Sequence, residues 1–193
     1  MPWLTVQEGL PHTWVRPALR TLEAAGAEAR VEDGRLEVRD TPHTRWALAT
    51  AEEFLEANQT IWSLAEELDK PVKPYKPLER YVLVAALLRS GDGDGPDAWA
   101  RICHEVIWAQ GLPNANHRST VLWLQSRVAP PGSTIHHAET LEEEMDAYLH
   151  DSKALIHERE HRPDQDRLKR EHQQRTRRFI HDWLAHMEWP QSR

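Results

Sequence analysis

Residues around the junction of two expected helices have the chemistry to bind an anion. One helical stretch runs from Asp97 to Gln110, and the next begins near Asn116. The first N–H groups of a helix have no partner within it, and the helix dipole places partial positive charge there. Arg118, in the first turn, adds a guanidinium suited to a bidentate phosphate contact. The sequence therefore predicts a phosphate site made by Asn114, Ala115, Asn116 and Arg118.

The same residues allow a second interpretation that needs no ligand. The side chain of Asn114 or Asn116 then caps the second helix, and Arg118 is a surface charge. Spacing alone leaves both interpretations open.

The segment from Ala98 to Leu122, AWARICHEVIWAQGLPNANHRSTVL, resembles the signature of the Fic/Doc (Fido) family. That signature runs His-x-Phe-x-Asp/Glu-Gly-Asn-x-Arg across a helix–loop–helix junction, and Asn116 and Arg118 stand at its phosphate-positioning positions. The resemblance implies a Fic-like helical bundle that binds a nucleotide such as ATP with Mg²⁺. It also implies transfer of AMP or a phosphoryl group to a protein hydroxyl, with a protein target or an antitoxin-like partner.

The chain departs from this signature at the residues that carry its chemistry. Gln110 stands in place of the catalytic histidine, and a carboxamide is not a general base. Asn114 stands in place of the acidic Mg²⁺ ligand, and a neutral oxygen binds a hard cation more weakly. His104 and His117 are the alternative bases. The resemblance therefore implies a divergent member that binds a nucleotide phosphate and whose transfer activity is weak or lost.

A second pattern, His157-Glu158-x-x-His161, matches the H-E-x-x-H motif of zinc hydrolases. Spacing of four residues on a helix places His157 and His161 on one face, with Glu158 nearby as a base. The surrounding residues are charged, which is typical of a solvated helix face. A zinc hydrolase is thus one further hypothesis.

A third pattern is the basic stretch 167–178. Such a face can bind nucleic-acid phosphates or an acidic partner, although most charge runs are solvated. A non-catalytic helical interaction module is therefore the main alternative to the nucleotide-binding hypothesis. Six cations make up this stretch: Arg167, Lys169, Arg170, Arg175, Arg177 and Arg178.

The elements that position these residues are almost all helical. Asp33-Gly34 between two alternating stretches predicts a β-hairpin near the start of the chain, and from residue 48 onward the apolar period is that of helices. We therefore expect an all-α fold with a small N-terminal β-hairpin. Expected helices cover 13–25, 48–69, 77–89, 97–110, a stretch from 116, 139–150, 152–161 and 164–187. The stretch 157–178 is so polar that we expect it to be solvated or to lie against a partner, outside the core.

Composition sets the remaining expectations. The chain has 193 residues with a formal net charge of −7, which argues against nucleic-acid binding through overall charge. Cys103 is the single cysteine, and no apolar run is long enough to span a membrane, so a cytoplasmic protein is predicted. The nine tryptophans are expected to be core and boundary residues. Three segments are expected: an N-terminal helix and hairpin (1–47), a Fic-like core (48–150) and a polar extension (151–193).

Overall fold

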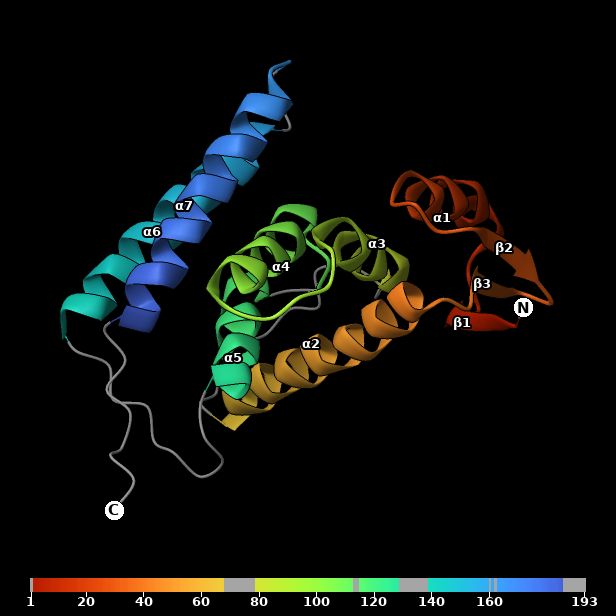
Figure 1. Cartoon of the computed structure of the whole chain (residues 1–193), viewed down its shortest axis with the longest axis horizontal. Helices are drawn as coiled ribbons and strands as arrows, with labels where there is room; N and C mark the ends of the chain where they lie inside the picture. Colours follow the sequence, from red (N-terminus) through yellow and green to blue (C-terminus); the bar gives the residue numbers. More distant parts are fainter. Residues whose placement is uncertain are drawn as a thin grey trace.

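A computed structural model describes residues 2–67, 79–112, 115–128, 139–159, 161 and 163–185. These residues are mostly helical and include one small sheet, which confirms the predicted fold class. The elements are β1 (Trp3–Glu8), α1 (His12–Ala24), β2 (Ala29–Glu32), β3 (Arg35–Arg39), α2 (Pro42–Glu67), α3 (Arg80–Ser90), α4 (Pro96–Ala109), α5 (Asn116–Val128), α6 (Glu139–Arg159) and α7 (Gln165–Ala185). The sheet and α1 lie at one end of the molecule and the α6–α7 pair at the other (Figure 1).

The N-terminal sheet has three antiparallel strands in the order β1-β3-β2. The predicted hairpin is confirmed: Asp33 and Gly34 both have positive φ, as a tight hairpin turn requires. The outer strand β1 was not predicted, because it is short and no hairpin turn joins it to the other two. Its Val6 is buried with Leu36 and Val38 of β3.

Helix α2 begins at Pro42, six residues before its apolar period becomes visible in the sequence. Its start is fixed by Thr41 and Thr44, which exchange backbone-to-side-chain hydrogen bonds of 2.9 and 3.1 Å, as in a capping box. Helix α3 lies among α1, α2 and α4 and is buried on almost every side, which agrees with its Val-, Leu- and Ala-rich sequence.

Two predictions about the C-terminal helices were wrong. The two expected helices 139–150 and 152–161 are replaced by one helix, α6, which runs without a break from Glu139 to Arg159, since no residue at their junction stops it. Helix α7 does not stay outside the core: it packs against α4 and α6. One face of α7 is buried, but this face was not recognised in the sequence because two of its six residues are polar. This face consists of Leu168, His172, Thr176, Phe179, Ile180 and Trp183.

Within the described ranges, no helix combines the length and the apolar character needed to cross a membrane. The predicted division at residues 47 and 150 remains a prediction, although α6 runs continuously across the second boundary.

Candidate ligand-binding cleft

The helix junction at 110–118 is held together by its own side chains. Gln110 ends α4 in the left-handed conformation, with φ of 52°, and its Nε2 donates to the carbonyl of Ile107 at 2.7 Å. Asn116 is buried. Its Oδ1 accepts from the Leu112 N–H at 2.9 Å, and its Nδ2 donates to the Leu112 carbonyl at 3.1 Å. The side chain of Asn116 therefore pins the loop between α4 and α5.

The other residues of the predicted phosphate site surround this bridge. Ala115 has a φ of 54°, and its carbonyl accepts from the Ser119 N–H at 2.9 Å. Arg118 is exposed and forms no ion pair with any residue in the described ranges. Asn114 lies outside the described residues. Phosphate binding here stays a prediction, with Asn116 bonded to the protein itself.

The two histidines proposed as alternative bases belong to a buried chain of hydrogen bonds, here named the histidine chain. It consists of His104 on α4, His117 on α5, Ser152 on α6 and His172 on α7. The Nδ1 atoms of His104 and His172 are 2.7 Å apart. Ser152 Oγ lies 2.7 Å from Nε2 of His172 and 2.7 Å from Nε2 of His117. The histidine chain thus ties the α6–α7 pair to α4 and α5.

The neighbours of His104 determine which atom donates and which accepts in each hydrogen bond of the histidine chain. Nε2 of His104 has no hydrogen-bond partner among the residues that the structure describes, and it lies 3.8 Å from a carboxylate oxygen of Glu105. A proton on this nitrogen is attracted by the carboxylate, whereas a lone pair would be repelled, so we assign the Nε2–H tautomer to His104. His172 Nδ1–H then donates to His104, Ser152 Oγ–H donates to His172, and His117 Nε2–H donates to Ser152.

Burial keeps all three imidazoles of the histidine chain neutral at pH 7. Burial is the main cause that lowers the pKa of His104 and of His117 to about 4 each; at His104 the Glu105 carboxylate opposes the shift and Lys169 adds to it, and at His117 Lys153 adds to it. Burial, together with the other two histidines, lowers the pKa of His172 to about 2. Because Ser152 and His172 are fully buried, no substrate reaches their reactive atoms. The histidine chain acts as a structural link.

The other two predicted sites gain little from the structure. His157 and His161 do lie together, with ring centres 5.4 Å apart, but no group of three His, Cys, Asp or Glu suited to a metal occurs in the described part of the chain. A zinc site needs three or four protein ligands.

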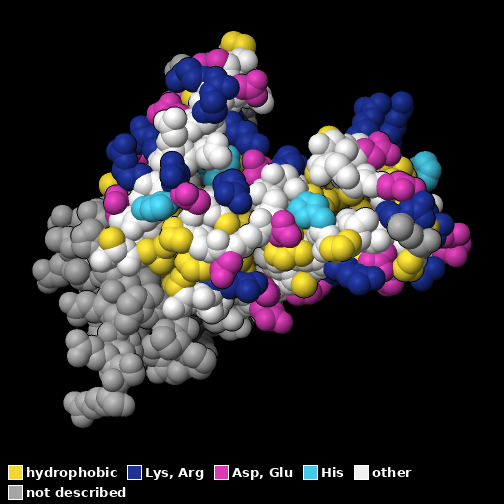
Figure 2. Space-filling view, viewed as in Figure 1, with side chains coloured by type: hydrophobic (Ala, Val, Ile, Leu, Met, Phe, Trp, Pro, Cys, Tyr) yellow, Lys and Arg dark blue, Asp and Glu magenta, His cyan; other side chains and the backbone are white. Residues whose placement is uncertain are grey.

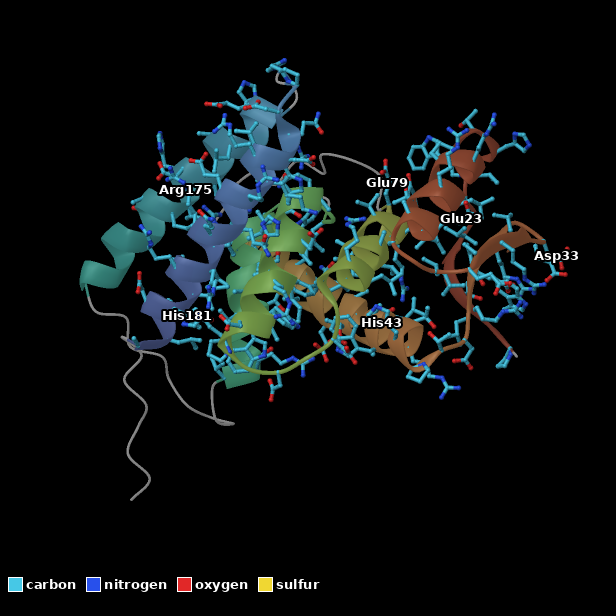
Figure 3. The ribbon with its side chains drawn as sticks, turned by 45° about the horizontal axis from the view of Figure 1, so that its top comes forward. Glu23, Asp33, His43, Glu79, Arg175 and His181 are labelled. Carbon is cyan, nitrogen blue, oxygen red and sulfur yellow. The ribbon has the colours of Figure 1, made fainter. Side chains whose placement is uncertain are left out.

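The basic stretch of α7 is largely paired with acids of the same chain. Arg167 donates to Asp164 at 2.7 Å, and Lys169 lies 2.5 Å from the Glu105 carboxylate. Arg175 and His181, labelled in Figure 3, are paired with Glu171 and Asp97, respectively. Figure 2 shows the resulting mixture of Lys or Arg with Asp or Glu over the α6–α7 pair. Such mixed charge is a weak footprint for nucleic acid.

The structure also contains a polar cleft that the sequence did not predict, here named the tryptophan cleft. Its volume is about 230 Å³. Its lining residues belong to α2, the loop between α3 and α4, α4 and α5, which lie next to one another in Figure 1. The described residues that line it are Trp46, Thr50, Gly93, Asp94, Trp99, Ile102, Trp123 and Arg127.

Helical spacing places two pairs of these residues in the tryptophan cleft. Trp46 and Thr50 are four residues apart on α2, and Trp123 and Arg127 are four residues apart on α5, so each pair shares a face. Glu53, one turn further along α2, accepts from Trp123 Nε1 at 2.8 Å and forms an ion pair with Arg127. Glu53 thereby joins α2 to α5 beside the cleft.

Contacts outside the tryptophan cleft support its walls. The ring of His43 (labelled in Figure 3) stacks on Trp46, with ring centres 5.8 Å apart and planes 4° apart. Nε2 of His43 lies 3.1 Å from the Leu88 carbonyl, near the end of α3. Trp123 stacks on Phe54 at 4.5 Å and is itself buried. Trp46 and Trp99 are half-buried at the edge of the cleft.

The loop between α3 and α4 brings a carboxylate to the tryptophan cleft. Asp94 lies between Gly93 and Gly95, which both have positive φ, and a Cβ at Gly93 would meet the Cβ of Ala98 at 3.1 Å. Only glycine fits this conformation without strain. In the sequence, GDGDGP indicated no more than a connection, and the tryptophans indicated core. The four-residue spacing of Trp46 with Thr50 and of Trp123 with Arg127 indicates a shared helix face but does not tell a cleft from a core.

Fold and cleft together define a mostly helical domain with a ligand-sized polar cleft. A family model described as "Family of unknown function (DUF8172)" matches residues 37–178. The chain belongs to this family. No curated protein and no solved structure was found to match the chain.

This assignment corrects the resemblance to the Fic/Doc family, which was wrong. The match runs from within β3 to within α7, and it includes the 98–122 segment on which that resemblance rested. An asparagine near the start of a helix is a common helix cap. A short helix–loop–helix stretch with such an asparagine and an arginine therefore does not identify a family.

Proposed function

We propose that this protein is a ligand-binding domain whose ligand is a small molecule held in the tryptophan cleft. The observation that carries the proposal is that three tryptophans, from α2, α4 and α5, meet around one cleft of about 230 Å³. Ligand sites are clefts with a few placed polar groups, and this cleft, whose accessible lining is mostly polar, is somewhat smaller than those of drug-sized ligands. The ligand is therefore small.

The polar groups of the tryptophan cleft suit binding better than catalysis. The hydroxyl of Thr50, on a residue only 2% exposed, forms no hydrogen bond with any other residue that the structure describes. It is available to a ligand. The lining residues named above offer one carboxylate, Asp94, and no imidazole or thiol, whereas acid–base chemistry needs a proton donor and acceptor placed on the reacting atoms.

A cytoplasmic setting forms part of this proposal. Its support is that the one cysteine, Cys103, is a free thiol buried in the core, as is usual where disulfides are not formed.

Ligand-observed NMR with a library of small water-soluble fragments tests the proposal. We expect fragments that bind wild type and the variant Trp14→Leu, which removes a half-buried tryptophan from α1, and that do not bind Trp99→Leu. Circular dichroism checks that both variants fold. Should Trp99→Leu not fold, Thr50→Val takes its place, since it removes only the free hydroxyl. If no fragment binds wild type, or if every fragment binds all variants equally, the proposal is wrong.

A further inference from the structure

We propose that the histidine chain makes the docking of the α6–α7 pair sensitive to pH. Acidification releases the pair from α4 and α5, while the sheet and α1 to α5 stay folded. The pair lies at one end of the molecule, where α7 packs against α4 (Figure 1). Helices α6 and α7 are consecutive in the chain, so they can separate from the preceding helices as one unit. This conformational change is independent of what the tryptophan cleft binds.

All the buried histidines of the described residues lie where the α6–α7 pair meets α4 and α5, here named the docking interface. They are His104 on α4, His117 on α5 and His172 on α7. Hydrogen bonds link them, with Ser152 of α6 between His117 and His172. In the described part of the sheet, α1, α2 and α3, no histidine is buried. Protonation of buried imidazoles therefore weakens the docking interface and leaves the rest of the core unchanged.

Cations of α6 and α7 lie near two of these histidines. Burial and the other two histidines lower the pKa of His172, and the guanidiniums of Arg159 on α6 and Arg175 on α7 add to this effect. Burial likewise lowers the pKa of His117, and the ammonium of Lys153 on α6 adds to it. A proton on either imidazole is therefore buried next to like charges, and release of the pair brings it into contact with water.

Glu105 is the carboxylate next to the histidine chain, and it opposes release only in part. Burial lowers the pKa of His104, whereas the Glu105 carboxylate, 3.8 Å from Nε2 of His104, opposes that shift. The same carboxylate is already bound by Lys169 of α7 at 2.5 Å and by Arg89 of α3 at 3.0 Å. Its charge is thus compensated before acidification, and a protonated His104 competes with two cations for it.

The ion pairs at the exposed edge of the docking interface do not produce the pH dependence. Asp97 of α4 accepts from Arg177 of α7 at 2.8 Å and lies 2.8 Å from Nε2 of His181, also on α7. The hydrogen bonds of Arg177 and His181 hold the pKa of Asp97 below its ordinary value, so this carboxylate stays charged at pH 5. Protonation of His181 strengthens its bond to Asp97 and opposes release, but exposed ion pairs contribute little.

Contacts inside the α6–α7 pair keep it together after release. The hydroxyl oxygens of Tyr148 on α6 and Thr176 on α7 are 2.9 Å apart, and the Tyr148 ring stacks on Phe179 of α7 at 4.3 Å. Asp151 of α6 forms an ion pair with Arg175 of α7. The released form therefore retains both helices.

The three histidines set the size of the effect. In the docked form their pKa values are about 4, 4 and 2, against about 6.5 for a histidine in water. The pair is therefore held fully above about pH 6.5, and its docking weakens as the pH falls below that value. Between pH 7 and pH 5, each histidine favours release about 20-fold, and the three together raise the ratio of released to docked form up to about 10⁴-fold.

The single cysteine reports on release. Cys103 is buried on α4 and lines a small apolar space at the docking interface together with Tyr148 and Phe179. Its thiol in the full chain is labelled with 4,4′-dithiodipyridine, which reacts with thiols at acidic pH. The labelling rate at each pH, divided by the rate in the urea-unfolded protein at that pH, gives the fraction of molecules with an accessible thiol.

We expect this accessible fraction to rise by about 10³–10⁴-fold between pH 7 and pH 5, with far-UV circular dichroism unchanged. Low urea concentrations should change the labelling rate less steeply than they change global unfolding, because release exposes less surface. In His172→Gln the rise should be about 20-fold smaller, and His117→Gln takes its place should that variant not fold. The matched control His150→Gln replaces an exposed imidazole on α6 and should keep the full rise.

Three results would overturn the proposal. The first is a rise of less than about tenfold in wild type, since even one titrating histidine gives more. The second is a labelling rate with the same urea dependence as global unfolding, because the thiol is then reached only when the whole molecule unfolds. The third is an equal rise in wild type and His172→Gln, which would assign the pH dependence to other groups.

Discussion

Acidification should weaken this fold before its carboxylates are protonated, because of the histidine chain. In the folded protein, His104 and His117 have a pKa of about 4, against 6.5 for a histidine in water. Between these two pH values the unfolded chain binds protons that the folded chain does not bind. Lowering the pH through this window therefore favours unfolding, and the stability is fully present only above about pH 6.5.

The expected size of the effect is large. Between pH 7 and pH 5, each buried histidine that stays neutral in the folded state lowers the free energy of unfolding by about 2 kcal/mol. The third member, His172, has a pKa of about 2 and behaves in the same way over this range. The three histidines together lower the free energy of unfolding by up to about 6 kcal/mol, which is comparable with the whole stability of many domains.

Urea unfolding followed by far-UV circular dichroism at pH 7, 6 and 5 measures this slope. Between pH 7 and pH 5, the free energy of unfolding of wild type should fall by several kcal/mol. His172→Gln should be less stable at pH 7, but its free energy of unfolding should fall by about 2 kcal/mol less over the same range. The control His150→Gln replaces an exposed imidazole on α6 and should keep the wild-type slope. A free energy of unfolding that changes by less than about 1 kcal/mol from pH 7 to 5 would refute the assignment of three neutral buried histidines.

Two further predictions concern the junction between α4 and α5. In urea titrations, Asn116→Ala should lower the free energy of unfolding by about 1–3 kcal/mol, because the buried N–H and carbonyl of Leu112 lose their partner. The control Arg118→Ala changes an exposed residue and should alter the free energy of unfolding by no more than about 0.5 kcal/mol. Equal effects of the two substitutions would contradict the structural role of Asn116. Gly111→Ala should lower the free energy of unfolding by about 1–3 kcal/mol and lower the Tm, since its Cβ would meet the Leu83 Cα at 3.1 Å. An unchanged Tm would show that α3 can shift to accommodate the added methyl group.

The fold class was predictable because periodicity and turn residues are local signals. Asp33-Gly34 located the hairpin, and prolines and glycines separated most helices. Helix α7 was misjudged for a physical reason. A buried face is recognised by its apolar residues, whereas His172 and Thr176 are buried through polar partners on other helices, which no local window contains.

The candidate site was not predictable in the same way. Trp46, Trp99 and Trp123 are spread over 78 positions, and a tryptophan in a core has the same sequence signal as one in a cleft. The local motif at 110–118 pointed instead to a loop whose asparagine bonds to its own backbone. How the helices pack decides whether residues far apart in the sequence lie close together. The cleft could therefore be recognised only from the positions of the helices in the structure.

The pairing of α7 with α4 also constrains the order in which the molecule assembles. His104 and His172 are 68 residues apart in sequence, so the extensive contact between α4 and α7 closes a long loop. Long loops are entropically slow to close, whereas α3 and α4 are neighbours along the chain and meet early. We therefore expect helix α7 to dock late in folding and to open early in unfolding, so that its amide protons exchange with solvent ahead of those in α3.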